Sequence, residues 1–167
     1  MRMNSFSIRT LGVPLAAFTF GAVVLGAGEA ASQQSAFVYV AKFVCGRAAT
    51  AANAPSPVAT GFYFTAINVH ALQVTDYKKI MSVALPGEKV GKVSPSAGGT
   101  LKDNEAMEID CPDIVKHLQF TPPVPPFVKG FVTIESAREL DVVAVYTAAA
   151  SPTTTVIALD VERVPKR

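Results

Sequence analysis

The sequence has no tryptophan, and among its 167 residues it has only two cysteines, Cys45 and Cys111, and two histidines, His70 and His117. The small aromatic content leaves few stacking platforms for sugars or bases. Histidine is the usual acid–base residue near neutral pH, so candidates for such catalysis are few. The Gly-x-Ser-x-Gly motif of serine hydrolases and the Gly-x-Gly-x-x-Gly motif of dinucleotide-binding folds are both missing. The sequence therefore offers no catalytic constellation.

The charges are nearly balanced, at 15 basic and 13 acidic side chains and a net charge of +2. Affinity for nucleic acids comes mainly from neutralising phosphates, and the basic residues do not gather in a cluster. We therefore expect no nucleic-acid partner. No motif for a cofactor is present, and none is expected.

The N-terminus has the order of a secretory signal. Arg2 and Arg9 flank the start, an uncharged apolar stretch runs from Leu11 to Leu25, and small residues surround Ala30. This order predicts a cleavable signal peptide with Ala31 as the new N-terminus. The alternatives are a shifted cleavage site and a permanent anchor, although about 15 apolar residues fall short of the roughly 20 that span a bilayer. No later segment is a candidate to span a membrane.

Removal of residues 1–30 leaves residues 31–167, which suit a single domain with a real core. Two cysteines in an exported chain are most simply a disulfide, here Cys45–Cys111. Free thiols and a metal site with His70 and His117 are the alternatives. The four residues lack the short local spacing of structural zinc sites, so no metal site is predicted.

Short apolar segments, rich in β-branched and aromatic residues, recur with turn residues about every ten positions. This spacing predicts an all-β domain, an antiparallel immunoglobulin-like β-sandwich of about seven or eight strands. A jelly roll or a small barrel is the alternative. We expect strands at residues 36–45, 61–71, 77–85, 90–93, 106–110, 127–136, 140–148 and 154–161.

One short helix is expected near residues 112–118. Asp110 can cap it, Pro112 suits its first turn, and Ile114 and Leu118 repeat at helical spacing. The preceding segment Ser94–Thr100 is rich in serine and glycine and is expected to be a loop.

Both faces of the predicted strands are largely apolar. In the strand at 61–71, Phe62, Phe64 and Ala66 share one face with Asn68 and His70. In an antiparallel sheet with one solvent-exposed face, apolar and polar residues should alternate more regularly along each strand. The pattern therefore suggests an interface for a homo-oligomer or a protein partner, and the alternative is small residues tolerated on a solvated surface.

Charges within the strands have a simpler interpretation. Lys42 and Lys129 are expected to point outward, as partners of Glu135 or Asp141, and residues 160–163 (DVER) end the last strand with a charged seam. Solvated outer-face charges are the plainer interpretation of both features.

Our preferred function is a non-enzymatic structural, assembly or binding module in the periplasm or outside the cell. The alternatives are a domain that binds a small ligand or carbohydrate in a loop-end pocket and a hydrolase or metal enzyme using His70 or His117. Phe120 and Phe127 are candidate walls for a loop-end pocket. The candidate ligand or partner contacts are Tyr63, Asn68, His70 and Tyr77.

Several short sequence segments of the chain resemble a group of exported bacterial single-domain β-sandwich proteins for which no activity is known. These segments are VCG (44–46), TAINVH (65–70), EIDC (108–111), VKGFVTIES (128–136), LDVVAVYTA (140–148) and DVERVP (160–165). The resemblance implies a secreted single domain with both cysteines in recurrent segments. It implies no catalytic residue.

Overall fold

The structure is a computed structural model that describes residues 37–49, 58–151 and 156–167. The predicted signal peptide and its cleavage site before Ala31 lie outside the described residues, as does the start of the first predicted strand at Ala36. Within the described ranges, no helix is long and apolar enough to cross a membrane.

The described residues form nine strands and one helix, so the predicted all-β class with one short helix is confirmed. Every strand pairing is antiparallel, as expected of segments joined by short turns. The elements are β1 (Phe37–Ala48), β2 (Gly61–Ala71), β3 (Thr75–Ala84), β4 (Val90–Val93), β5 (Ala97–Leu101), β6 (Ala106–Asp110), α1 (Cys111–Leu118), β7 (Phe127–Ser136), β8 (Leu140–Ala149) and β9 (Val156–Arg163).

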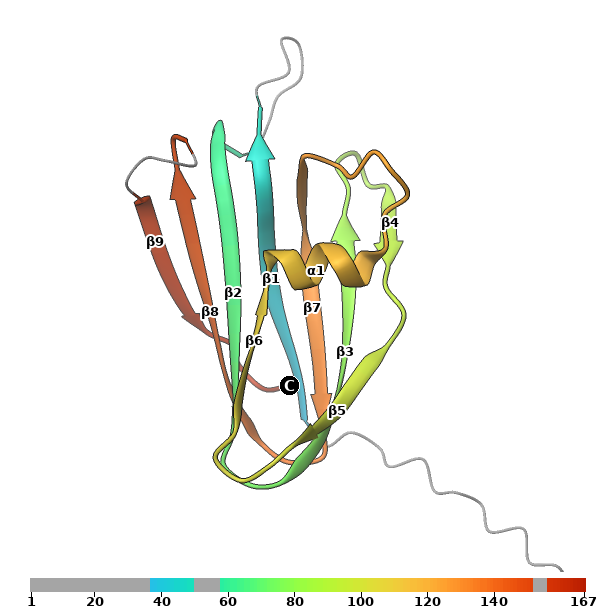
Figure 1. The fold of residues 1–167 in the computed structure, drawn as a ribbon, viewed down its shortest axis with the longest axis vertical. Helices are drawn as coiled ribbons and strands as arrows, with labels where there is room; N and C mark the ends of the chain where they lie inside the picture. The colour runs from blue at the N-terminus through green and yellow to red at the C-terminus, as the bar shows by residue number, and fades with distance from the viewer. Residues whose placement is uncertain (1–36, 50–57, 152–155) are drawn as a thin grey trace, which may run out of the picture. The chain divides into compact units, whose positions relative to one another are not determined.

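All nine strands belong to one hydrogen-bonded sheet (Figure 1), which divides into two layers where β1 and β2 are joined at one end only. One layer has the order β3-β7-β1, with β4 and β5 beside β3, and the other has the order β6-β2-β8-β9. In an immunoglobulin-like sandwich, one sheet has the order A-B-E-D and the other C-F-G. Strands β1, β2, β3, β7, β8 and β9 occupy the positions of B, C, D, E, F and G. Among the described strands, none occupies the position of A.

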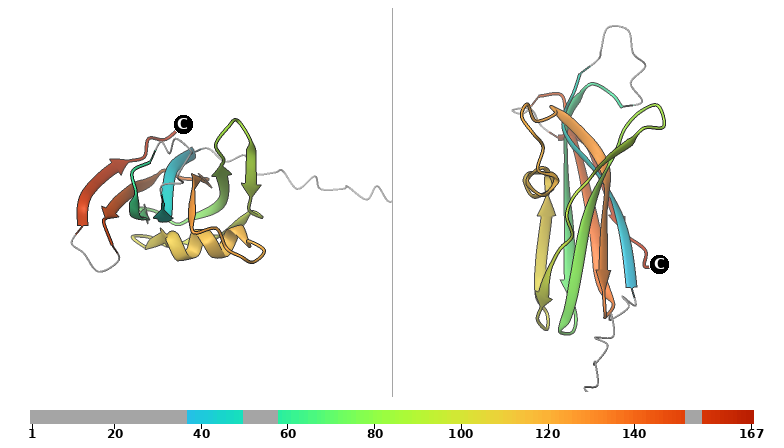
Figure 2. Two further views of the ribbon diagram at one scale, coloured as in Figure 1. Left: turned by 90° about the horizontal axis from the view of Figure 1, so that it is seen from above. Right: turned by 90° about the vertical axis from the view of Figure 1, so that its right-hand side faces the viewer.

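The two layers separate where β1 and β2 diverge. These strands pair only through Gly46–Ala48 and Gly61–Tyr63, and β2 continues beside β6 instead. The side between β6 and β3 is covered by α1 and by the β5–β6 connection (Figure 2). On the opposite side the C-terminal residues reach back to β1, where Lys166 forms a bridge with Tyr39. The backbone N–H of Arg167 also donates to the Val38 carbonyl at 2.9 Å.

One hydrophobic core lies between the layers and beneath the helix. Alternate residues of each central strand point into it, as the strand period of two requires. The Cys45–Cys111 disulfide, with an S–S distance of 2.07 Å, ties β1 to the start of α1. The largest fully buried side chains are Tyr39, Phe43, Ile67, Met81, Ile109, Ile114, Leu118 and Ile134, followed by Val69, Val132, Val142 and Thr65.

The helix α1 is formed as its sequence predicts. The Asp110 side chain accepts a hydrogen bond from the Asp113 backbone N–H at 3.0 Å, which satisfies a free donor of the first turn. The helix ends at Gln119, which adopts a left-handed conformation with φ 48°. Ile114 and Leu118 are fully buried, so this short helix is held by packing.

The predicted loop at Ser94–Thr100 is wrong in its second half, because Ala97–Leu101 forms β5 beside β3. Glycine-rich segments have low β-propensity, which hid this strand. Here the glycine is needed for close packing, since a Cβ at Gly98 would lie 2.3 Å from the Tyr77 carbonyl oxygen. The predicted number of seven or eight strands was therefore one short.

Candidate binding site

An open cleft of about 370 Å³ lies where the layer of β8 and β9 extends past the edge of β1. Lys42 and Val44 of β1 form one wall, and Tyr146 of β8 with Asp160 and Glu162 of β9 belong to the other layer. Pockets for small ligands and side chains usually start near this volume. This side of β1 is where strand A of an immunoglobulin-like sandwich lies.

Among the described residues, the β1 edge that faces the cleft has no strand neighbour between Val40 and Cys45. On one side β1 pairs with β7 throughout residues 37–46. On the other side it meets β2 only from Gly46 onward and meets Lys166 at Tyr39. Within the part of the chain that the structure describes, residues 40–44 therefore have no strand neighbour on the side of the cleft, and side chains of the facing layer bond the backbone of Lys42 and Val44.

Side chains from the facing layer satisfy part of this edge. The Thr65 hydroxyl donates to the Val44 carbonyl at 3.1 Å and accepts from the Val44 N–H at 3.0 Å. Thr65 is fully buried, and its own backbone N–H points to the disulfide sulfur of Cys111 at 3.1 Å. Thr65 thus takes the place of a strand neighbour at the point where β1 and β2 separate.

The electrostatics of the cleft centre on Tyr146 and two carboxylates. The Tyr146 hydroxyl donates to Glu162 Oε2 at 2.9 Å. Burial raises the pKa of Tyr146 above the usual tyrosine range, and Glu162 and Asp160 raise it further, whereas a hydrogen bond with the Lys42 backbone acts the other way. The phenol therefore stays protonated and keeps the Glu162 carboxylate as its acceptor.

A second surface lies on the outer face of β2, β8 and β9. Opposite residues of antiparallel strands share a face, and register pairs Ala66 with Val145 and Val145 with Val161. Phe64 is 41% exposed and Leu159 65% exposed on this face, and both residues also border the cleft. We call these five residues, Phe64, Ala66, Val145, Leu159 and Val161, the outer apolar face.

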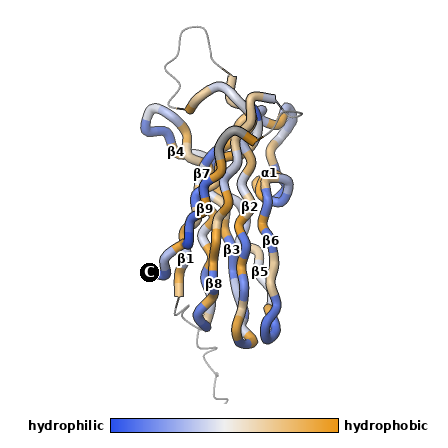
Figure 3. The backbone as a smooth tube through the Cα atoms, turned by 90° about the vertical axis from the view of Figure 1, so that its left-hand side faces the viewer, coloured by the Kyte–Doolittle hydropathy of each residue, from blue (hydrophilic) through white to orange (hydrophobic). Residues whose placement is uncertain are grey.

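The outer face changes character toward the β7–β8 turn, which is hydrophilic in Figure 3. Asn68 and His70 lie here on β2, and His70 is opposite Asp141 of β8. Arg163 forms an exposed ion pair with Asp141, with Nη1 and Oδ1 3.4 Å apart. The predicted partner for Asp141 was Lys42 or Lys129, and the structure gives it Arg163 instead.

The four predicted contact residues are not gathered in one place. Tyr63 lines the cleft, and its hydroxyl donates to the Ala59 carbonyl at 2.6 Å. Asn68 and His70 lie on the outer face of β2, at the polar end. Tyr77 lies on β3 in the other layer, where it packs partly buried against the core.

The predicted pocket walls Phe120 and Phe127 are also separate. Phe127 contacts Tyr63 edge-on, with ring centroids 5.8 Å apart. Phe120 packs against the core, and the Lys92 ammonium lies 5.6 Å from its ring centre. Only the contact of Phe127 with Tyr63 lies next to the cleft.

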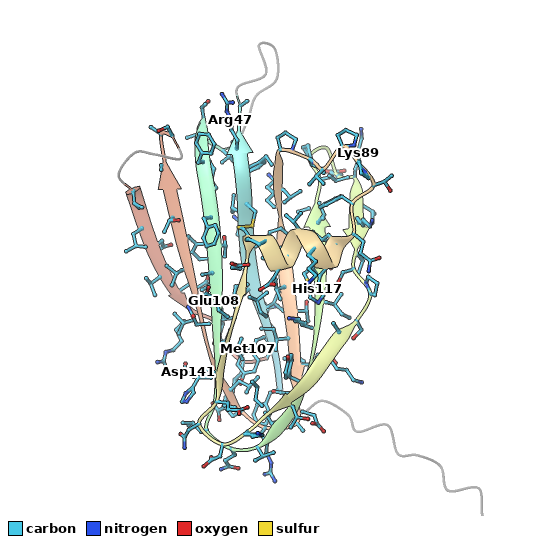
Figure 4. All side chains as sticks on the ribbon, viewed as in Figure 1. Arg47, Lys89, Met107, Glu108, His117 and Asp141 are labelled. Atoms are coloured by element: carbon cyan, nitrogen blue, oxygen red, sulfur yellow. A yellow bond between two sulfur atoms is a disulfide. The ribbon has the colours of Figure 1, made fainter. Side chains whose placement is uncertain are left out.

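The histidines are not placed for chemistry with the cysteines. His117 lies on α1 (Figure 4), with Nδ1 3.1 Å from the Asp113 carbonyl oxygen, and both cysteines are in the disulfide. His70 is on the outer face of β2, away from the helix. No group of three or more His, Cys, Asp or Glu residues that could hold a metal ion occurs among the described residues.

A further pocket of about 340 Å³ lies at the opposite end of the strands. It is lined by Phe37, by Leu72 and Gln73 of the β2–β3 turn, and by Ala137–Glu139 of the β7–β8 turn. Its polar lining residues, Gln73, Arg138 and Glu139, lie in turns, whereas the cleft beside β1 is built on strands and is the better defined site.

Sequence reasoning missed the polar and charged residues of the cleft, namely Lys42, Tyr146, Asp160 and Glu162. The sequence pattern favours solvated outer-face charges for Lys42 and residues 160–163. Their alternation with apolar residues does show that they share one face of each strand. Which face looks into a cleft depends on pairing between the two ends of the chain.

Comparisons with protein-family models, with curated proteins and with solved structures find no match for this chain.

Proposed function

We propose that this protein is an exported, non-enzymatic binding module whose cleft between β1 and β9 receives an extended segment of a protein partner. The observation that carries the proposal is the open β1 edge at the place where an immunoglobulin-like sandwich has strand A. Recognition by strand addition uses such an edge, since main-chain hydrogen bonds supply affinity and alternate side chains supply specificity.

The dimensions of the cleft suit a short strand. Residues Val40–Val44 span about 17 Å at the usual rise of about 3.3 Å per residue, and an added strand would compete with Thr65 for the Val44 backbone. The volume of about 370 Å³ beside it holds one or two side chains of the added segment. A free small ligand would use the cavity but would leave most of the β1 edge uncovered.

Export is part of the proposal and has its own check. The disulfide fits an oxidising compartment, and the N-terminal pattern and the resemblance to exported bacterial proteins point the same way. We expect the exported protein to begin at Ala31 and to carry no alkylatable thiol before reduction. Intact-mass measurement before and after reduction and alkylation reads both properties, and a retained N-terminus would contradict export with cleavage.

The binding role is tested with a displayed library of short random peptides selected against the exported protein. A selected peptide is then titrated into ¹⁵N-labelled protein. We expect the amide signals of Val40–Val44 and of β9 to shift together, with those of α1 unchanged. Failure to enrich any peptide, or shifts confined to other strands, would contradict the proposal. Stabilisation by a sugar alone, with the same amide shifts, would favour the small-ligand alternative.

The outer apolar face supports a second candidate function, self-assembly. The face covers three strands about 4.8 Å apart, and its area is on the order of 300 Å². A stable dimer usually buries about 800 Å² on each partner, so we expect self-association through this face to be weak. Sedimentation of the exported protein with and without Val161→Lys measures it. An unchanged, purely monomeric profile at high concentration would remove this candidate.

A further inference from the structure

We infer that the cleft selects a basic side chain, lysine or arginine, from the extended segment that it binds. This inference rests on the proposed function and adds the chemistry of the partner. It is carried by the arrangement of charges around the cleft together with the alternation of side chains along any strand that fills it.

The wall of the cleft formed by β9 is acidic. Asp160 and Glu162 are two positions apart on one strand, so their side chains lie on the same face. Register places Asp160 opposite Tyr146 and Glu162 opposite Ala144, whose side chain is buried in the core, so this is the inward face of the layer. All three of Asp160, Glu162 and Tyr146 line the cleft.

The two carboxylates remain available to a ligand. Both residues are exposed, and Glu162 accepts one hydrogen bond, from Tyr146. A carboxylate has about four acceptor positions, so that bond orients Glu162 without saturating it. Among the described residues that line the cleft, Lys42 of the β1 wall is the one basic residue.

The charge pattern also argues against a second copy of β9 as the occupant. A copy of β9 added to the β1 edge with its inward face toward the cleft would bring its own Asp160 and Glu162 close to the carboxylates of the cleft wall. Like charges brought close together repel each other and disfavour this occupant. A partner strand with alternating apolar and basic residues instead places its basic side chains toward Asp160 and Glu162.

Three matched peptides test the inference by fluorescence anisotropy. Each is a short strand of alternating threonine and valine, with lysine, norleucine or glutamate replacing valine at alternate positions. We expect the affinity order lysine, norleucine, glutamate, with lysine roughly five- to tenfold tighter than norleucine. Added salt should weaken the lysine peptide and leave the norleucine peptide unchanged.

Variants locate the effect. The double variant Asp160→Asn/Glu162→Gln should remove the preference for lysine over norleucine. The matched control Glu108→Gln/Asp141→Asn removes two carboxylates elsewhere on the same layer (Figure 4) and should retain the preference.

The outcomes separate this inference from the proposed function. Equal affinity of the lysine and norleucine peptides would leave the strand-binding function standing and overturn the basic specificity. Tighter binding of the glutamate peptide would also overturn it and would indicate that Lys42 governs the cleft. If no peptide binds, both the function and the specificity are wrong.

Discussion

Thr65 should be one of the most sensitive polar positions in the fold, because its hydroxyl replaces a strand neighbour of β1. Both of its hydrogen bonds go to the backbone of Val44, one as donor at 3.1 Å and one as acceptor at 3.0 Å. Thr65→Val keeps the shape of the side chain and removes both bonds. The Val44 N–H and C=O then lose their partner at the point where the two layers separate.

The expected cost follows from these two groups. A buried polar group left without a partner costs about 1–3 kcal/mol. Val44 borders the open cleft, so water can reach it in part, and the low end of that range applies to each group. We therefore expect Thr65→Val to lower the free energy of unfolding by about 2 kcal/mol. For a domain of this size the melting temperature should fall by about 6–10 °C.

Thr65→Ser is the matched control, because it keeps the hydroxyl and loses only a methyl group. Its cost should be about 1 kcal/mol or less. Urea unfolding with the disulfide intact measures both variants, and equal m-values would show that the same surface is exposed on unfolding. If Thr65→Val proves as stable as Thr65→Ser, the hydroxyl does not support β1 and the reasoning about its open edge is wrong.

Three other predictions concern the disulfide, one glycine and one tyrosine. Replacing Cys45 and Cys111 together with alanine removes a link between residues 66 positions apart and should lower the free energy of unfolding by about 4 kcal/mol. A loss below about 1 kcal/mol in urea unfolding would contradict the chain-entropy argument. Gly130→Ala places a Cβ 1.9 Å from a β3 carbonyl oxygen and should lower the free energy of unfolding by well over 2 kcal/mol in the same measurement. The added Cβ of Gly87→Ala contacts no atom within 4 Å, and only the left-handed φ of 71° disfavours it, so this variant should cost about 1 kcal/mol. The pKa of Tyr146 is raised in the folded state, so its contribution to the free energy of unfolding is complete below about pH 10 and is lost as the pH rises further. The free energy of unfolding should therefore fall between about pH 9 and 11. The fall should be less steep in Tyr146→Phe.

Much of the fold could be predicted because it depends on local pattern. The strand at 61–71 and the strand at 127–136 have the bounds of β2 and β7, since β-branched and aromatic residues alternate between turn residues there. Asp110 and Pro112 marked the start of α1 for the same local reason. The glycine-rich β5 was missed, because its pairing comes from close approach to β3 rather than from its own propensity.

The candidate site could be predicted only in part. Tyr63 was identified as a contact and does line the cleft, whereas Asn68 and His70 lie on the outer face and Tyr77 lies on another strand. Aromatic residues near turns are a local signal, and that signal found Tyr63. No local signal shows which charged strand residues face an opening.

The sequence by itself determined the all-β class, the helix and its cap, and the alternation that divides each strand into two faces. Its two cysteines also allowed a single intramolecular disulfide. The tertiary structure alone decided that β1 keeps an open edge and that Lys42 shares a cleft with Asp160 and Glu162. These features depend on which strands become neighbours and on where the layers separate. Both are set by packing between distant parts of the chain, and no segment records them locally.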